Sequence, residues 1–156
     1  MLANKLAIQS GVKVATASLE QLTSRHYTFL SKRFDRSDAR RRIHFASALT
    51  LLGYSDGDDY RTGASYLELA EFIMRYSANL KQDLEELCRR IVFSIAISNT
   101  DDHLRNHGFL LSNEGWILSP AYDINPVAEG TGLKLNISEN DNTLDTNVAL
   151  GIIDFF

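Results

Sequence analysis

The chain contains 156 residues, of which 44% are hydrophobic and 23% are charged, and these proportions exclude a disordered or collagen-like polypeptide. Sixteen basic residues against twenty acidic ones give a net charge of −4, which argues against a general nucleic-acid or membrane-surface binder. The single cysteine, Cys88, cannot form an internal disulfide, and no apolar run is long enough for a membrane-spanning helix. We therefore expect one soluble, cytoplasmic domain that contacts neither membrane nor nucleic acid directly.

The beginning of the chain predicts a helix followed by two short strands. Apolar residues within 2–8, followed by Gly11, indicate the last turns of a helix that ends at a glycine. The segment 12–22 is predicted to be extended, and a β-prone run occupies 27–34. We expect these two stretches to pair as antiparallel strands.

The middle of the chain has the apolar spacing of helices. A helix is predicted over 37–53, and the arginines within it are interpreted as a solvated helix face. Ser65 and Glu68 match a capping box at the start of a second amphipathic helix. A long helix is predicted over 79–95. Because its second half is apolar on nearly every side, we expect it to run through the core.

The pattern changes after this long helix. Residues 99–107 are almost all polar, and two apolar segments, 108–112 and 115–119, follow with two polar residues between them. Such a pattern predicts a β-hairpin. A second polar loop occupies 121–126, so the hairpin should bring both polar loops to the same end. A further short strand is predicted over 133–137.

The two polar loops carry oxygen-bearing side chains in an order that suits phosphoryl transfer. Asp101 and Asn106 are five positions apart on the first loop, and Asp123 lies on the second. Magnesium prefers oxygen ligands and leaves part of its shell to water and phosphates. Asn106 and Asp123 could therefore hold Mg²⁺, while Asp101 accepts the proton of an incoming hydroxyl. Protein kinases use the same order of Asp, Asn, hairpin and Asp.

Three segments resemble the HipA-like serine/threonine kinases, the toxin components of bacterial toxin–antitoxin pairs. They are 98–108 (Ser-Asn-Thr-Asp-Asp-His-Leu-Arg-Asn-His-Gly), 118–126 (Leu-Ser-Pro-Ala-Tyr-Asp-Ile-Asn-Pro) and 32–36 (Lys-Arg-Phe-Asp-Arg). The resemblance implies an α+β fold, mainly α, similar to the C-lobe of a protein kinase. The fold would include a catalytic-loop β-hairpin and a short N-terminal strand pair.

The resemblance also implies roles for individual residues of the polar loops. Asp101 resembles the catalytic base, and Asn106 and Asp123 resemble the metal ligands. His103 occupies the position of a histidine in the family's catalytic loop. Arg105 stands where the family often carries a lysine, so it would steer phosphate with a different geometry.

The segment 32–36 resembles the stretch that joins the two kinase lobes and contacts adenine. Lys32, Arg33 and Phe34 would accordingly bind ATP, although Lys32 stands where the family often carries a glutamate. The cofactors implied are ATP and Mg²⁺. The partners implied are a protein substrate with an acceptor Ser or Thr and a DNA-binding antitoxin.

Two parts of such a kinase have no counterpart in the sequence. The family carries a phosphate-covering loop and an ATP-binding lysine in an N-terminal lobe, and no glycine-rich phosphate motif occurs here. We interpret 1–36 as the end of the N-lobe with the interlobe segment, and 37–156 as part of the C-lobe. We therefore expect a kinase that is weak or inactive in isolation, or one that needs an N-lobe from a separate chain.

Several alternatives remain open from the residues alone. Asp101 and Asp123 could be ordinary turn residues, and Asp102 competes with Asp101 as the base, although the spacing to Asn106 favours Asp101. His103 and His107 lie four positions apart, as in some zinc sites, but bracing of the loop by hydrogen bonds from His103 is the preferred interpretation.

Two alternatives concern the function as a whole. The chain could be a non-catalytic fragment or an interaction subunit that needs a separate N-lobe. It could also be a metal-dependent phosphoester hydrolase built on Asp101, Asp102, His103 and Asp123.

Overall fold

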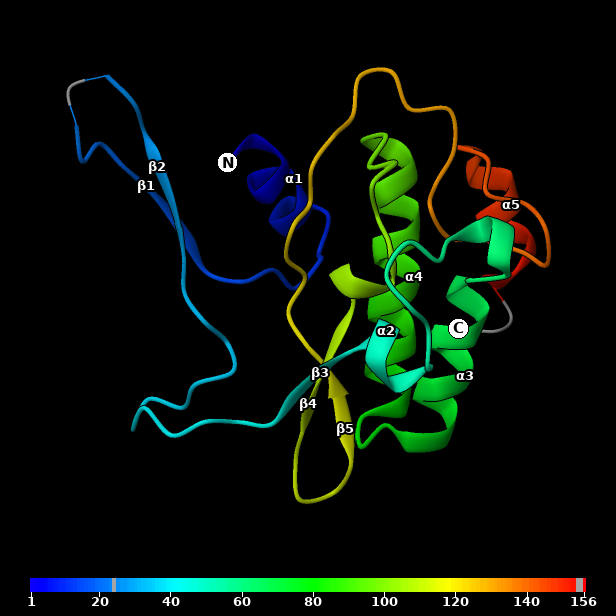
Figure 1. Ribbon diagram of the computed structural model, residues 1–156, viewed down its shortest axis with the longest axis horizontal. Helices are drawn as coiled ribbons and strands as arrows, with labels where there is room; N and C mark the ends of the chain where they lie inside the picture. Colours follow the sequence, from blue (N-terminus) through cyan, green and yellow to red (C-terminus); the bar gives the residue numbers. More distant parts are fainter. Residues whose placement is uncertain (24, 154–155) are drawn as a thin grey trace.

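The computed structural model describes residues 1–23, 25–153 and 156. Figure 1 shows a body of helices and a short hairpin, from which a two-stranded ribbon projects. The ribbon consists of β1 (Ala17–Glu20) and β2 (Thr28–Ser31), which are antiparallel with Ala17 opposite Ser31. The predicted pairing of the two N-terminal stretches is therefore confirmed.

The predicted N-terminal helix is also present, as α1 (Leu2–Gln9). It ends where Gly11 adopts a φ of 79°, a left-handed conformation that glycine accepts without a Cβ penalty. Ala7 and Val12 then pack with Phe93 and Ala121 in a small second core. This contact attaches the N-terminal segment to the body.

The helix predicted over 37–53 is wrong for most of its length. Only α2 (Ala48–Leu51) is helical, and the side chain of Ser47 caps it by accepting a hydrogen bond from the Thr50 N–H. The preceding residues form β3 (Phe45–Ser47), which pairs with β4 (Gly108–Leu111). Pairing with a distant strand overrides a helical pattern because tertiary contacts outweigh local propensity.

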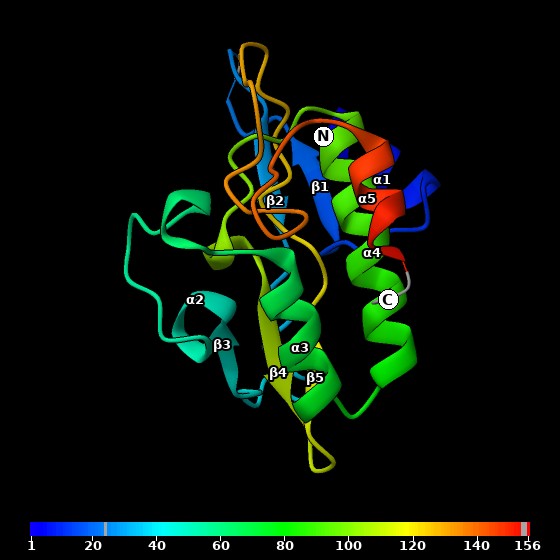
Figure 2. The ribbon, with the colours of Figure 1, turned by 90° about the vertical axis from the view of Figure 1, so that its right-hand side faces the viewer.

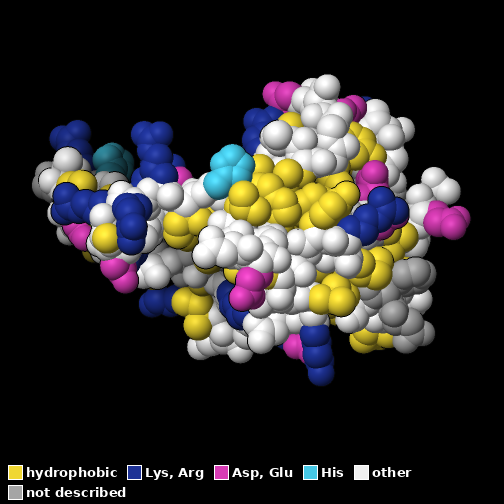
Figure 3. Space-filling model, turned by 90° about the horizontal axis from the view of Figure 1, so that it is seen from below, with side chains coloured by type: hydrophobic (Ala, Val, Ile, Leu, Met, Phe, Trp, Pro, Cys, Tyr) yellow, Lys and Arg dark blue, Asp and Glu magenta, His cyan; other side chains and the backbone are white. Residues whose placement is uncertain are grey.

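The arginines of this segment do not form a helix face. Arg40 has a φ of 59°, and the side chain of Ser37 accepts a hydrogen bond from the Arg41 N–H, so the chain turns here. Arg40, Arg41 and Arg42 are exposed. In Figure 3, Lys and Arg side chains gather on the projecting part of the molecule, whereas hydrophobic side chains gather on the face of the body seen from below.

The two main helices form as the sequence predicts. The first, α3 (Tyr66–Tyr76), has both hydrogen bonds of the Ser65–Glu68 capping box. The second, α4 (Leu80–Ala96), begins after Asn79. Figures 1 and 2 show α4 in the middle of the body, beside α3 and the short helix α5 (Thr146–Gly151).

The predicted hairpin is present as β4 and β5 (Trp116–Leu118), with Phe109 opposite Leu118. Together with β3 it makes a three-stranded sheet in the order β3-β4-β5. The core packs this sheet against α3 and α4, and its largest fully buried apolar side chains are Tyr66, Leu69, Ile73, Leu87, Ile91, Leu104, Phe109, Leu133, Leu135 and Ile137. The architecture is α+β, as predicted.

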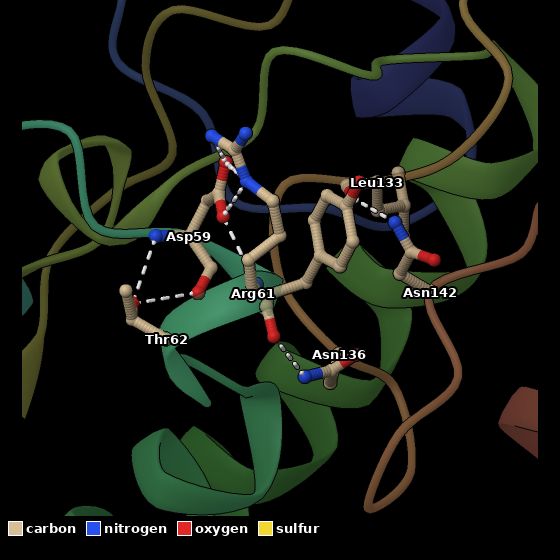
Figure 4. A network of polar contacts seen from close by, with 7 residues as sticks. Asp59, Arg61, Thr62, Leu133, Asn136 and Asn142 are labelled. Carbon is tan, nitrogen blue, oxygen red and sulfur yellow. Dashed lines mark hydrogen bonds and ion pairs between the residues drawn. The ribbon is translucent and has the colours of Figure 1, made fainter.

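The strand predicted over 133–137 is wrong. The segment buries its alternating apolar residues, but it forms only one isolated bridge, between Ser65 and Asn136. Figure 4 shows how it is tethered instead: the Asn136 amide donates to the carbonyl of Tyr60, and the Asn142 amide donates to the carbonyl of Leu133. Main-chain bonds to Tyr60, Ala64 and Tyr66 add to these side-chain bonds, so the segment is held without a continuous strand ladder.

The same close-up contains the short 3₁₀ helix Tyr60–Thr62 that follows the acidic loop 55–59. Asp59 caps it by accepting from the Arg61 N–H at 2.9 Å and also pairs with the Arg61 guanidinium. The Tyr60 N–H donates to the carbonyl of Lys134 at 2.8 Å, which joins this helix to the segment 133–137. Asp59 and Lys134 line one pocket together with Asp101 of the polar loop.

The buried side of α4 is not purely apolar, which corrects the expectation for its second half. Asp83, Glu86, Arg90 and Ser94 are all 5% exposed or less and recur at helical spacing along one side. We call these four residues the polar stripe of α4. Charged side chains are rarely buried unless they are paired, so the partners of the polar stripe matter.

Each member of the polar stripe binds a segment outside α4. Asp83 accepts from the Leu118 N–H at 2.9 Å and from the Ser77 hydroxyl at 2.7 Å. Arg90 donates to the carbonyl of Ser119 at 2.6 Å and to Glu86 at 2.8 Å. The end of the hairpin is therefore fixed to the central helix by buried, charge-assisted hydrogen bonds.

We predict that Asp83→Ala destabilises the protein by about 2–4 kcal/mol, because two donors lose a charged acceptor in the interior. Denaturant unfolding followed by circular dichroism measures the change. Glu85→Ala is the matched control on the same helix. The Glu85 side chain is 45% exposed and only 3.8 Å from Arg89, so the control should change stability by less than about 0.5 kcal/mol. Equal losses in both variants would contradict the anchoring role of Asp83.

Candidate active site

Two neighbouring aspartates of the polar loop 99–107, Asp101 and Asp102, lie in different environments. Asp101 is exposed, and none of the described residues forms a hydrogen bond or ion pair with its carboxylate. Asp102 is only 4% exposed, and its carboxylate is surrounded by polar partners. Of the two, only Asp101 is accessible to a substrate hydroxyl.

Asn106 lies at the end of a short 3₁₀ helix, Leu104–Asn106, inside the same loop. Its side chain is buried, and its amide nitrogen donates to the main-chain carbonyl of Asp101 at 3.2 Å. This bond leaves the amide oxygen as the group of Asn106 that can bind a cation. It also ties the position of Asn106 directly to that of Asp101.

The second polar loop lies at the same end of the hairpin as the first, as predicted. The Tyr122 hydroxyl donates to the carbonyl of Arg105 at 2.6 Å, and the Asn125 N–H donates to the Asn99 side chain at 3.4 Å. Asn106 and Tyr122 both line a small cavity of about 20 Å³ between the loops. The residue next to Tyr122 is Asp123.

Asp123 is exposed and has a φ of 54°. A non-glycine residue in this region carries a conformational cost, and such residues cluster at functional sites. One carboxylate oxygen accepts from the Asn125 amide at 2.6 Å. Since no described residue binds the other oxygen, Asp123 retains an acceptor that faces solvent.

The predicted adenine-contacting residues line an open pocket of about 530 Å³. The ring of Phe34 lies 5.7 Å from that of Phe45 and 5.6 Å from that of Tyr122. These contacts join the segment 32–36 to β3 and to the second polar loop. The pocket is lined by Ser31, Lys32, Arg33, Phe34, Asp35, Phe45, Ser47, Arg105 and Tyr122.

Two cations of this pocket already have partners. Arg33 makes a bidentate contact with Asp35, with distances of 2.8 and 2.6 Å. Lys32 lies 3.7 Å from Asp38, and both side chains are strongly exposed. The hydrogen bond from Arg33 lowers the pKa of Asp35 most, burial opposes it, and the charges of Arg33 and Arg36 help to hold the pKa at about 2.

Arg105 and His103 of the first polar loop lie beside the acidic loop 55–59. Arg105 forms an ion pair with Asp56, and a pocket of about 190 Å³ lies between the loops. His103 lines this pocket together with Asp101, but its buried Nδ1 atom has no hydrogen-bond partner among the described residues. The hydrogen-bonded bracing expected of His103 is therefore not formed by Nδ1.

Metal sites made of several acidic or histidine side chains are not supported. Within residues 1–23, 25–153 and 156, no group of three His, Cys, Asp or Glu side chains is placed to hold a metal ion. This finding argues against the zinc alternative for His103 and His107. It also argues against the hydrolase alternative built on Asp101, Asp102, His103 and Asp123.

A buried network around Asp102 escaped the sequence analysis. Tyr66 on α3 and Ser94 on α4 donate hydroxyl hydrogen bonds to one Asp102 oxygen, at 2.6 and 3.3 Å. His107 Nε2 lies 3.1 Å from the other oxygen. The spacing of Tyr66 and Ser94 on their helices indicates only core positions, so no local signal could have revealed these contacts.

The environment of Asp102 favours its ionised form. Burial acts to raise the pKa of Asp102, but the charge of His107 and the hydroxyls of Tyr66 and Ser94 outweigh it, so the pKa lies below its ordinary value. The pKa of Tyr66 is raised, first by burial and then by the Asp102 charge. The pair is therefore a neutral phenol donating to a carboxylate.

Comparison with known proteins identifies the fold and the family of the chain. The structure resembles a chain of the Shewanella oneidensis MR-1 toxin–antitoxin complex of HipA, HipB and operator DNA, with a TM-score of 0.75 and 21% identity, over 90% of this chain and 38% of that one. The fold is thus HipA-like. The HipA-like C-terminal domain model matches residues 1–153, so the chain belongs to this family.

Two curated relatives are described as kinases. A putative kinase of Haemophilus influenzae is 30% identical over 105 residues, which cover 64% of this chain and 31% of the relative. The putative kinase Y4mE of Sinorhizobium fredii is 27% identical over 126 residues, which cover 77% of this chain and 30% of the relative. The chain thus spans about a third of their length. No described helix is long and apolar enough to cross a membrane.

We predict that the carboxyl of Asp35 titrates with a midpoint near pH 2, and that Arg33→Gln moves this midpoint up towards the ordinary value of 3.8. Carbon-13 NMR of the carboxyl group measures both. Because the pKa is lowered in the folded protein, the stability contributed by Asp35 is complete above pH 3.8 and is lost as the pH falls towards 2. Arg36→Gln is the control and should cause a smaller shift. An unchanged midpoint in Arg33→Gln would contradict the assigned cause.

Proposed function

We propose that the domain is the catalytic part of a serine/threonine protein kinase that transfers the γ-phosphoryl group of ATP to a protein hydroxyl. The observation that carries the proposal is the pairing of an exposed Asp101 with a buried Asn106 whose amide is bonded to the Asp101 main chain. Membership of the HipA-like family and two relatives described as putative kinases add support. The helical body would then correspond to a kinase C-lobe.

In this proposal Asp101 accepts the proton of the acceptor Ser or Thr. Its carboxylate is free of partners among the described residues, so it can approach a hydroxyl without first breaking an ion pair. The bond from Asn106 to the Asp101 carbonyl fixes the main chain below the carboxylate. A fixed base matters because positioning supplies most of the catalysis in phosphoryl transfer.

Asn106 and Asp123 would hold Mg²⁺. The donor set fits the ion, since it offers an amide oxygen and a carboxylate oxygen and leaves the remaining positions to water and phosphate. The ion would neutralise charge on the transferred phosphoryl group. Within the chain, the Tyr122 hydroxyl bond to the Arg105 carbonyl keeps the loop of Asp123 against the loop of Asn106.

The pocket beside Phe34 would take the adenine of ATP. Phe34, Phe45 and Tyr122 supply aromatic surface, and Lys32 and Arg33 lie on its rim. Arg105 lines the same pocket and would steer phosphate, for which it must exchange its ion pair with Asp56. His103 lines the neighbouring pocket together with Asp101 and Arg105 and would contact the acceptor side of the site.

The partners follow from the family and belong to the same proposal. A protein substrate would supply the acceptor hydroxyl, and a DNA-binding antitoxin would bind the kinase, as HipB and operator DNA accompany HipA in the similar structure. Since the chain spans about a third of its relatives, an N-lobe carrying the phosphate-covering loop would come from outside residues 1–156. Without that lobe the domain would serve as a non-catalytic interaction subunit.

We predict that Asp101→Asn, in the full-length protein that contains this domain, lowers phosphate transfer from radiolabelled ATP by at least about 100-fold, because the proton acceptor is lost. ATP binding measured by calorimetry should stay within about twofold, since Asp101 does not line the Phe34 pocket. Glu114→Gln, at the exposed hairpin tip, is the control and should retain full transfer. Undiminished transfer by Asp101→Asn would refute Asp101 as the base.

A further inference from the structure

The loop that carries Asp101 and Asn106 contains one buried carboxylate, that of Asp102, which contacts the end of the loop at His107. Asp102 directly follows Asp101, and His107 directly follows Asn106. One oxygen of Asp102 lies 3.1 Å from His107 Nε2. This contact joins Asp102 to His107, and the 3₁₀ helix Leu104–Asn106 lies between these two residues.

The same carboxylate is attached to two helices of the body. The Tyr66 hydroxyl from α3 and the Ser94 hydroxyl from α4 donate to its second oxygen. The Tyr66 ring also meets the His107 imidazole edge-on, with centroids 5.7 Å apart and planes at 90°. Tyr66, Ser94, Asp102 and His107 are each 8% exposed or less, so these contacts are shielded from water.

We propose that Tyr66, Ser94, Asp102 and His107 form a clamp that positions Asp101 and Asn106 for phosphoryl transfer. This inference rests on the proposed kinase function for its catalytic consequence, whereas its structural part concerns only the loop. None of the four residues touches the substrate in this scheme. They are positioning residues that act through their neighbours in the sequence.

The chemistry of the clamp suits this role. An ionised carboxylate accepts hydrogen bonds more strongly than a neutral group, and a dry environment strengthens them further. Burial alone would favour the neutral acid of Asp102, but the surrounding groups lower its pKa, so the charge is retained. Tyr66 is consequently the decisive donor: it is fully buried and makes the 2.6 Å bond.

The clamp also accounts for the separation of the two aspartates. The Asp102 carboxylate is occupied by three contacts inside the protein, and these leave its neighbour Asp101 facing outwards on a fixed main chain. Displacement of a catalytic group by about 1 Å can cost about 100-fold in rate. A loosened clamp should therefore reduce turnover well before it unfolds the domain.

The test compares Tyr66→Phe with Tyr54→Phe in the full-length protein. Tyr54 is the matched control, because its hydroxyl also donates to a carboxylate, that of Glu68, at 2.9 Å. Tyr54 is distant from the loop 99–107 in sequence and lines neither of the pockets beside that loop. Tyr66→Phe removes a single oxygen and retains the ring. We expect it to lower kcat at least about tenfold with KM for ATP within twofold, whereas Tyr54→Phe should leave both within twofold.

Hydrogen–deuterium exchange supplies a readout that is independent of activity. Amides of residues 99–107 should exchange at least about tenfold faster in Tyr66→Phe, with α4 unchanged, and should be unaffected in Tyr54→Phe. If exchange in 99–107 does not change, or if α4 is loosened equally, the clamp is refuted. If the wild-type protein transfers no phosphate, the kinase proposal fails, but the exchange result still decides whether the clamp exists.

A double-mutant cycle separates the clamp from general core stability. Asp102→Asn should itself lower kcat at least about tenfold, and Tyr66→Phe added to it should have less than a twofold further effect, because the bond is already weakened. Tyr54→Phe should act identically with and without Asp102→Asn. Fully multiplicative losses for Tyr66→Phe and Asp102→Asn would show independent roles and overturn the proposal.

Discussion

The rest of the structure depends on the buried polar stripe of α4. Asp83 and Arg90 bind the end of the hairpin, and Ser94 reaches the carboxylate of Asp102. A purely apolar helix would hold the same layers by packing, but it would not fix their register, because dispersion contacts have little directional preference. Buried charge-assisted hydrogen bonds are directional, so one helix sets where the hairpin ends and where the polar loop begins.

Because the polar stripe fixes the loop 99–107 to the body, the loop has a buried inner side and an exposed outer side. On the inner side of the loop 99–107, Asp102 binds Tyr66 of the body and contacts His107. The outer side carries Asp101, which is exposed, and Arg105, which reaches the acidic loop. The proposed chemistry thus occupies a surface whose geometry is set by the interior, which is the usual requirement for a preorganised site.

Sequence patterns predicted the elements whose signals are local. The capping box of Ser65 and Glu68, the spacing of α3 and α4 and the hairpin near 113–114 all depend on residues a few positions apart. The patterns failed over 37–53 and 133–137, where distant partners decide the conformation. Phe45 joins β4 more than sixty residues away, and Asn136 pairs with Tyr60. No local pattern contains those partners.

By itself, the sequence determined the main helices, the hairpin and the order of Asp101, Asn106 and Asp123, because periodicity and spacing are properties of neighbouring residues. The α+β class came from the resemblance of its motifs to the HipA-like family. Only the tertiary structure decided which of two adjacent aspartates is buried and which residues hold it there. Tyr66, Ser94 and His107 come from three separate segments. Their convergence on one carboxylate exists only once α3 and α4 have packed around the loop.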